Sequence, residues 1–163
     1  MGAGLRTARW RRRAAPFPRR AVPAVRNCPS ATVAGSVQRV DPRSNRLVAT
    51  IPVGPVPRFL VTGAGGVWVL NQGDGTVSRI DPATNRVVAT IAADVAGPGG
   101  DIAVGANRVW VRATRVLLSA IDPATNRVVA RFGPPMGSGA VRVANNIVWV
   151  SAHDVNTLWA IRP

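Results

Sequence analysis

Two neighbouring residues in this sequence, His153 and Asp154, have the types needed for acid–base chemistry. A histidine beside a carboxylate can move protons because imidazole titrates near neutral pH. The sequence supplies no nucleophile in register with this pair, no second acid beside it and no glycine-rich phosphate loop. We therefore predict no catalytic residues, place the pair in a solvent-exposed turn, and favour a protein that is not an enzyme.

Three aspartates recur at separations of 40 and 41 residues, which places one in each unit of a repeat and too far apart to share a metal. Each begins an Asp-Pro-x-(Ser/Thr)-Asn segment. In such a segment Asp caps a turn, Pro fixes φ and Asn accepts a left-handed conformation. The structural turn residues are Asp41, Asn45, Asp81, Asn85, Asp122 and Asn126. We expect no metal site and no cofactor.

Polar residues in and beside the predicted loops form a candidate binding rim, because loops on a rigid scaffold commonly carry function. Arginines at strand ends, Arg142 included, are able to attract anions there. The Gly/Pro-rich segments 52–57, 97–100 and 133–139 are further places where a ligand would be met. The candidate residues are Arg58, Asn71, Asp74, Arg112, Arg115, His153 and Asp154.

The elements that must position these residues are short β-strands in a repeat of about 40 residues. A Val-Trp-Val landmark recurs with tryptophans at 68, 110 and 149, which we expect to pack between repeats. One repeat divides into four runs of β-branched or aromatic residues, at 58–62, 67–70, 76–80 and 86–91, separated by turn residues. This pattern predicts an all-β fold in which each repeat is a four-stranded antiparallel blade.

The repeats predict a partial β-propeller over residues 35–163, with about three blades. It comprises a half blade at 36–52, blades at 57–91 and 100–132, and an incomplete blade at 139–162. Propellers close a ring of about four to eight blades, so this number leaves apolar faces open. We expect a fragment of a longer propeller or, alternatively, self-association through the open blade edges.

Residues 1–34 form a leader rich in arginine and proline, which we predict to be disordered. Eight of the 21 arginines precede residue 28, where no acid occurs, and they account for all but +6 of the net charge of +14. The arginines are not followed by the apolar run of a signal peptide. Association of the leader with nucleic acid or an anionic surface is an alternative function, disfavoured because Trp10 gives little aromatic interleaving.

Composition also excludes several structural features. Cys28 is the single cysteine, so no intrachain disulfide and no cysteine-based zinc site can form. No run of 18 apolar residues occurs, so we predict no membrane-spanning helix.

The segments at 79–91, Arg-Ile-Asp-Pro-Ala-Thr-Asn-Arg-Val-Val-Ala-Thr-Ile, and at 66–71, Gly-Val-Trp-Val-Leu-Asn, resemble the YVTN-type β-propeller repeat of many bacterial surface or secreted proteins. They are also similar to the repeats of the virginiamycin B lyase family. The first resemblance implies a seven-bladed, extracytoplasmic module for binding or scaffolding. The second implies a magnesium-dependent, ring-opening lyase.

Of these two functions the sequence favours the first. The lyase chemistry is expected to draw on a histidine and a glutamate, whereas this chain has one His and no Glu. That alternative would need a divalent metal and a second acidic group from additional sequence. We therefore predict a non-enzymatic module for binding or protein interaction, with an unidentified ligand or protein as its partner.

Overall fold

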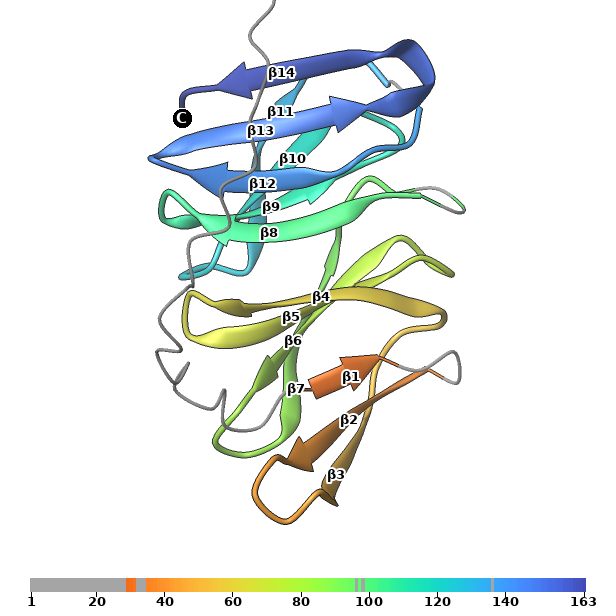
Figure 1. Cartoon of the computed structure of the whole chain (residues 1–163), viewed down its shortest axis with the longest axis vertical. Helices are drawn as coiled ribbons and strands as arrows, with labels where there is room; N and C mark the ends of the chain where they lie inside the picture. The colour runs from red at the N-terminus through yellow and green to blue at the C-terminus, as the bar shows by residue number, and fades with distance from the viewer. Residues whose placement is uncertain (1–28, 32–34, 96, 98, 136) are drawn as a thin grey trace, which may run out of the picture.

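The structure, a computed structural model, describes residues 29–31, 35–95, 97, 99–135 and 137–163, which form four antiparallel sheets (Figure 1). Each sheet is a meander of strands adjacent in sequence, and we number them blade 1 to blade 4. Blade 1 holds β1 (Pro29–Ala31), β2 (Ser36–Asp41) and β3 (Arg46–Pro52). Blade 2 holds β4 (Pro57–Gly63), β5 (Gly66–Asn71), β6 (Thr76–Asp81) and β7 (Arg86–Ala92).

The second half of the chain repeats this arrangement. Blade 3 holds β8 (Asp101–Gly105), β9 (Arg108–Arg112), β10 (Leu118–Asp122) and β11 (Arg127–Phe132). Blade 4 holds β12 (Val141–Ala144), β13 (Ile147–Ala152) and β14 (Thr157–Ile161), with a short 3-10 turn, η1 (His153–Val155), between the last two. The prediction of an all-β fold with four-stranded antiparallel blades is confirmed.

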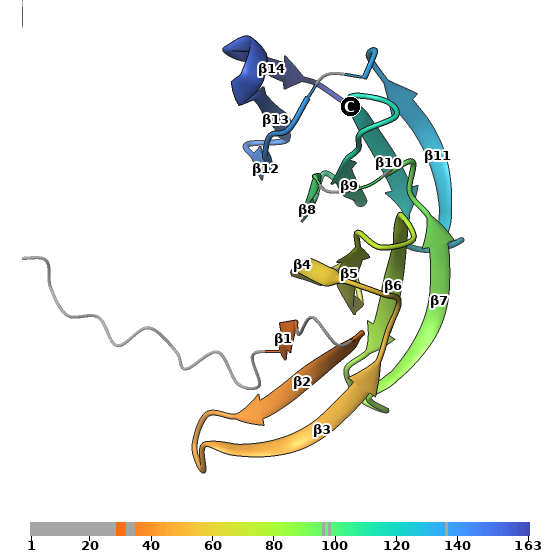
Figure 2. The same cartoon turned by 90° about the vertical axis from the view of Figure 1, so that its right-hand side faces the viewer.

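The blades stack face to face along an open arc (Figure 2). Strands β4, β8 and β12 line its inner side, and β3, β7 and β11 lie on its outer side. Strand β8 contacts both β4 and β12, so neighbouring blades meet closely at the inner side. This arrangement gives the blades two ends, one at each end of the arc.

Strand β1 was not predicted from the sequence, because it lies within the leader at 1–34. It pairs antiparallel with β2, from Pro29 opposite Arg39 to Ala31 opposite Val37. Without β1, the edge of β2 would leave a row of backbone N–H and C=O groups unpaired. Pairing with these groups explains why Pro29–Ala31 forms a strand although its sequence does not indicate one. The remaining leader residues, 1–28 and 32–34, lie outside the described residues.

The core lies between the blades, where alternate residues of the central strands point to opposite neighbours. In β5, Val67 and Val69 pack toward blade 1, while Trp68 and Leu70 pack into the core shared with blade 3. Every residue of β5 is buried, because both faces of the strand are covered. The predicted packing of tryptophans between blades is confirmed for Trp68 and for Trp110, its equivalent in blade 3.

Trp68 and Trp110 are also satisfied as hydrogen-bond donors. The indole Nε1 of Trp68 donates to the Gly63 carbonyl at 3.0 Å, and that of Trp110 donates to the Gly105 carbonyl at 2.9 Å. Trp159 is partly buried against the core between blades 3 and 4. Tryptophan rings therefore pack between blades 2 and 3 and between blades 3 and 4, and the indole donors of Trp68 and Trp110 are both paired.

The Asp-Pro-x-(Ser/Thr)-Asn segments form the predicted turns. Asp81 Oδ1 accepts the Ala83 N–H at 2.9 Å, and its Oδ2 accepts the Thr84 hydroxyl at 2.9 Å. Asn85 has a φ of 56° and donates its N–H to the Asp81 carbonyl at 2.9 Å. Corresponding bonds, with φ values of 54° and 56° at the asparagines, occur in the turns that begin at Asp41 and Asp122.

These turns also fasten one blade to the next. Arg79 Nη1 donates to the Pro123 carbonyl at 2.6 Å and to Asn126 Oδ1 at 2.8 Å in blade 3. Arg39, at the equivalent position in blade 1, donates to the Pro82 carbonyl at 2.8 Å and to Asn85 Oδ1 at 2.7 Å in blade 2. We call this arginine-to-turn contact the clasp.

We predict that Arg79→Lys lowers the free energy of unfolding by about 1–3 kcal/mol, because an ammonium group cannot reproduce the guanidinium contacts with the next blade. The Arg79 guanidinium also lies 4.9 Å from the Trp68 ring centroid, where it makes a cation–π contact. Urea unfolding followed by tryptophan fluorescence would measure the change. Arg86→Lys, at an exposed position, is the matched control; equal losses in the two variants would contradict the clasp.

A second prediction concerns acid. The N–H of Ala83 and the hydroxyl of Thr84 hold the pKa of Asp81 below its ordinary value of 3.8, and the Ser44 hydroxyl and Arg43 N–H do the same for the pKa of Asp41. Because these pKa values are lower in the folded chain, the stabilisation is complete above the unfolded value, about 4, and is lost as pH falls through the folded value.

We therefore expect the urea midpoint to fall between about pH 5 and pH 2, and to fall less in Asp81→Asn. The amide oxygen of the variant still accepts the Ala83 N–H but does not titrate. Parallel curves for the two proteins would show that the turn carboxylate does not contribute.

Candidate functional site

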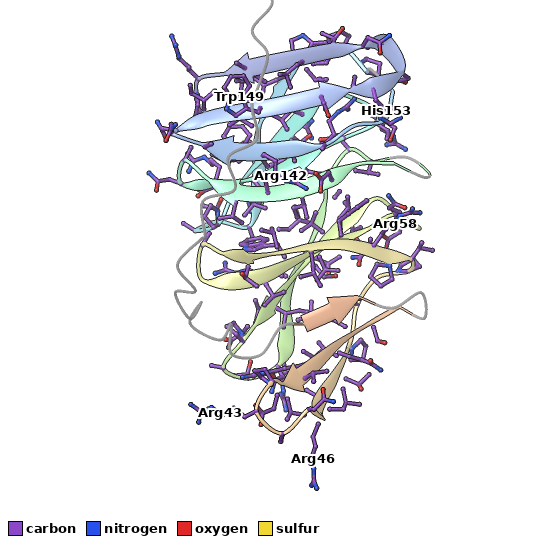
Figure 3. The ribbon with its side chains drawn as sticks, viewed as in Figure 1. Arg43, Arg46, Arg58, Arg142, Trp149 and His153 are labelled. Carbon is purple, nitrogen blue, oxygen red and sulfur yellow. The ribbon has the colours of Figure 1, made fainter. Side chains whose placement is uncertain are left out.

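All seven residues of the predicted binding rim lie at one end of the blades. In an antiparallel meander, alternate connections emerge at the same end of the sheet. The connections β5–β6, β9–β10 and β13–β14 and the start of β4 share this end, which we call the loop face. Figure 3 shows Arg58 and His153 there, whereas Arg43 lies at the opposite end, the turn face.

Two members of the predicted rim, Asn71 and Arg112, are buried. Asn71, at the end of β5, donates from Nδ2 to the Thr76 hydroxyl at 2.9 Å and to the Ser78 hydroxyl at 2.9 Å. Its Oδ1 is buried and accepts no hydrogen bond from the described residues. The side chain of Asn71 thus ties β5 to β6 inside blade 2.

The second buried member, Arg112, joins blade 3 to blade 4. Its Nη1 donates to the carbonyls of Ala113 and Leu117, its Nη2 to Gly137 at 2.9 Å and its Nε to Ser151 at 3.3 Å. Burial lowers the pKa of Arg112, while the charge of Asp154 acts in the opposite direction. Because a guanidinium loses little charge at neutral pH, Arg112 is a buried cation held by backbone oxygens.

Four other members are exposed and lie in three different loops. Asp74 caps its own turn, accepting the Thr76 N–H at 3.1 Å and the Thr76 hydroxyl at 2.7 Å. Arg115 is exposed in the β9–β10 loop. His153 and Asp154 are exposed in the turn η1, as the sequence predicted.

Arg142, which the sequence analysis named among the arginines able to attract anions, lies on β12, the inner strand of blade 4. Its Nη1 forms an ion pair with Asp101 Oδ2 in blade 3. The same carboxylate oxygen accepts the Val141 N–H at 3.0 Å. Asp101 is therefore a link between blades 3 and 4.

The seventh member, Arg58, lines a crevice of about 230 Å³ on the loop face that three blades build together. The other lining residues come from the start of β4 and from the connections β5–β6, β7–β8 and β11–β12. They are Phe59, Gln72, Gly99, Gly100 and Ser138. The crevice is smaller than the 300 Å³ or so of a typical small-molecule pocket, so it suits a side chain or a short segment of chain.

One polar side chain of this crevice, that of Gln72, is held in place by a hydrogen bond. Gln72 is almost fully buried and donates from Nε2 to the Gly99 carbonyl. The Arg58 guanidinium lies 5.9 Å from the Phe59 ring centroid and makes no hydrogen bond or ion pair with any described residue. Of the lining residues, Phe59 was missed by sequence reasoning, whereas Gln72, Gly99, Gly100 and Ser138 lie in loops that were expected to meet a ligand.

In the described part of the chain, no group of three or more His, Cys, Asp or Glu side chains is close enough to hold a metal ion. None of the described helices has the length and apolar character needed to cross a membrane.

No protein-family model matches the sequence, and no curated protein matches it. Among solved structures, the chain is similar to the computationally designed Ika4 protein, with a TM-score of 0.70 and 17% identity over 83% of this chain and 84% of that one. It is also similar to the WD40 domain of Pan2 from Neurospora crassa, with a TM-score of 0.62 and 14% identity over 78% of this chain. These structures are β-propeller-like. This chain is a partial β-propeller.

A further propeller-like structure, AztD from Citrobacter koseri, gives a TM-score of 0.59 and 16% identity over 69% of this chain. The partial propeller spans 34% of AztD and 43% of the Pan2 structure, less than half of each. At identities below 20% these similarities concern the fold alone. The resemblance to the YVTN-type repeat has no support from a family model.

We predict that Arg112→Met lowers the free energy of unfolding of the partial propeller by about 3 kcal/mol, because several buried carbonyls lose their charged donor. Arg115→Met, three residues away at an exposed position, should change it by less than about 0.5 kcal/mol. Urea unfolding of both variants tests the pair. A small loss in Arg112→Met would mean that water replaces the guanidinium without cost.

Proposed function

We propose that this partial propeller is a non-enzymatic module that binds protein segments carrying a carboxylate, and that the crevice of the loop face is its site. The observation that supports the proposal is the position of Arg58. Its guanidinium stands at the crevice with no hydrogen-bond or ion-pair partner among the described residues, beside the Gln72 amide and Ser138. An exposed arginine next to polar side chains suits a planar carboxylate, which it can bind with two parallel hydrogen bonds.

The size and chemistry of the crevice favour a peptide over a larger ligand. A volume of about 230 Å³ accommodates one or two side chains. The Phe59 ring supplies apolar surface beside the Arg58 guanidinium. The excess of +6 charges after residue 28 would favour the approach of an acidic partner.

The lining of the crevice also favours binding over catalysis. The His153–Asp154 pair lies in the exposed turn η1 and is not among the residues that line the crevice. The crevice itself has no residue of the types that act as nucleophile and general base together. The resemblance to the YVTN-type repeat supports an extracytoplasmic binding role, which we include in the proposal.

The proposal can be tested by selecting binders from a phage-displayed library of random peptides on the full chain. We expect the selected peptides to share an Asp or Glu, and replacement of that residue by Asn or Gln to weaken binding about tenfold or more. Arg58→Gln should weaken binding to a similar extent. Arg115→Gln, which removes an exposed arginine elsewhere on the loop face, should not.

Two results would overturn the proposal. One is a set of selected peptides without a shared acidic residue. The other is equal weakening by Arg58→Gln and Arg115→Gln, which would indicate attraction by overall charge and no specific site.

A further inference from the structure

The free face of blade 4 carries the residues that, in blade 3, receive the next blade. Alignment of the repeats matches Trp149 with Trp110, Leu158 with Leu118, and Ala160 with Ala120. The three blade 3 residues are buried in the core that blade 4 completes. In blade 4, Trp149 is 38% exposed and Leu158 is 62% exposed. The face is built like a junction between blades, and no described residue covers it.

The free face of blade 1 has the complementary character. Val40 and Leu47 match Ile80 and Val87 of blade 2, which pack into the core shared with the preceding blade. Leu47 is 55% exposed, because no blade precedes blade 1 among the described residues. The two ends of the arc therefore present the two halves of one repeating junction.

We propose that a second copy of this chain covers these faces, with blade 4 of each copy packed on blade 1 of the other. Such a head-to-tail contact closes a ring if the rotation between copies allows it. Two copies bring eight blades, which is within the range of about four to eight in which propellers close. The open arc in Figure 2 leaves both terminal faces accessible to a second copy. This proposal does not depend on the peptide site.

The clasp indicates how blade 4 of one copy would align with blade 1 of the other. The turn of blade 1 has the same geometry as its equivalents in blades 2 and 3, with Asn45 at a φ of 54° and its side chain exposed. No described residue donates a hydrogen bond to Asn45 Oδ1. The clasp position of blade 4 is Ala160, so the contact between copies lacks the arginine that Arg39 and Arg79 supply within the chain. The junction between copies is then weaker than those within the chain.

The first test is the mass of the full chain in solution, measured by light scattering after size exclusion. We expect twice the 17.1 kDa of one chain at high concentration, with dissociation on dilution. Leu158→Asp, on the free face of blade 4, should give a monomer. Val88→Asp is the matched control, because Val88 is 54% exposed on the outer strand β7 and away from the terminal faces; it should leave the dimer intact.

The second test adds the missing clasp. Ala160→Arg should lower the dissociation constant of the dimer about tenfold or more, because each copy gains charged hydrogen bonds to the other's turn. Asn45→Gly removes the acceptor oxygen yet tolerates the positive φ, so it should cancel most of that gain in the double variant. A gain that does not depend on Asn45 would contradict the proposed register.

Three results would overturn the proposal. A monomer at every concentration would mean that no second copy covers these faces, as in a piece of a longer propeller. A mass that grows continuously with concentration would mean that the contacts form an open array. A dimer unaffected by Leu158→Asp would place the contact elsewhere.

Discussion

A blade with apolar side chains on both faces is stable only when another sheet covers each face, and the rest of this structure depends on that constraint. It explains why β5 is buried throughout and β9 is buried from Val109 to Arg112, although strands in a sheet with one solvent face would alternate. It also explains why a tryptophan recurs in the second strand of blades 2, 3 and 4: a large ring on one blade fills the wedge-shaped space before the next. The repeat in the sequence is the repeat of this junction.

Much of the fold could be predicted because its signals are local. The Asp-Pro-x-(Ser/Thr)-Asn turn is specified within five residues, since Asp81 binds groups two and three positions later and Asn85 adopts the left-handed conformation itself. Strand runs and their turns could be predicted for the same reason. The short strand β1 was not predictable, because the edge of β2 induces it and its own sequence has little strand character.

The candidate site was less predictable because its parts come together only through the stacking of blades. Arg112 was a candidate for the binding rim, yet its partners are distant in the sequence: Gly137, 25 residues away, lies in the loop before blade 4, and Ser151, 39 residues away, lies on blade 4. The crevice combines Arg58 with Ser138, which lies in the loop between blades 3 and 4. Only the positions of the loops, which follow from the repeat, indicated which end of the blades would carry the site.

The junctions between blades are fastened by different chemistry along the arc. Between blades 1 and 2 and between blades 2 and 3, arginines on the turn face bind the next turn through Asn85 and Asn126. Between blades 3 and 4 the clasp position is Ala120, and the described part of blade 4 has no corresponding turn for an arginine to bind. Blades 3 and 4 are instead joined by two other contacts. On the loop face, Arg112 donates hydrogen bonds to backbone carbonyls, and on the inner strands Asp101 forms an ion pair with Arg142.

This change has a consequence for the two ends of the arc. A clasp arginine is useful only where a turn lies opposite it, because an unpaired guanidinium beside a core would oppose burial. Alanine at position 160 leaves the face of blade 4 apolar, with Trp149 and Leu158 exposed on it. An apolar face without a clasp arginine can be covered and uncovered reversibly. A contact between separate chains requires this reversibility, whereas a contact within one chain does not.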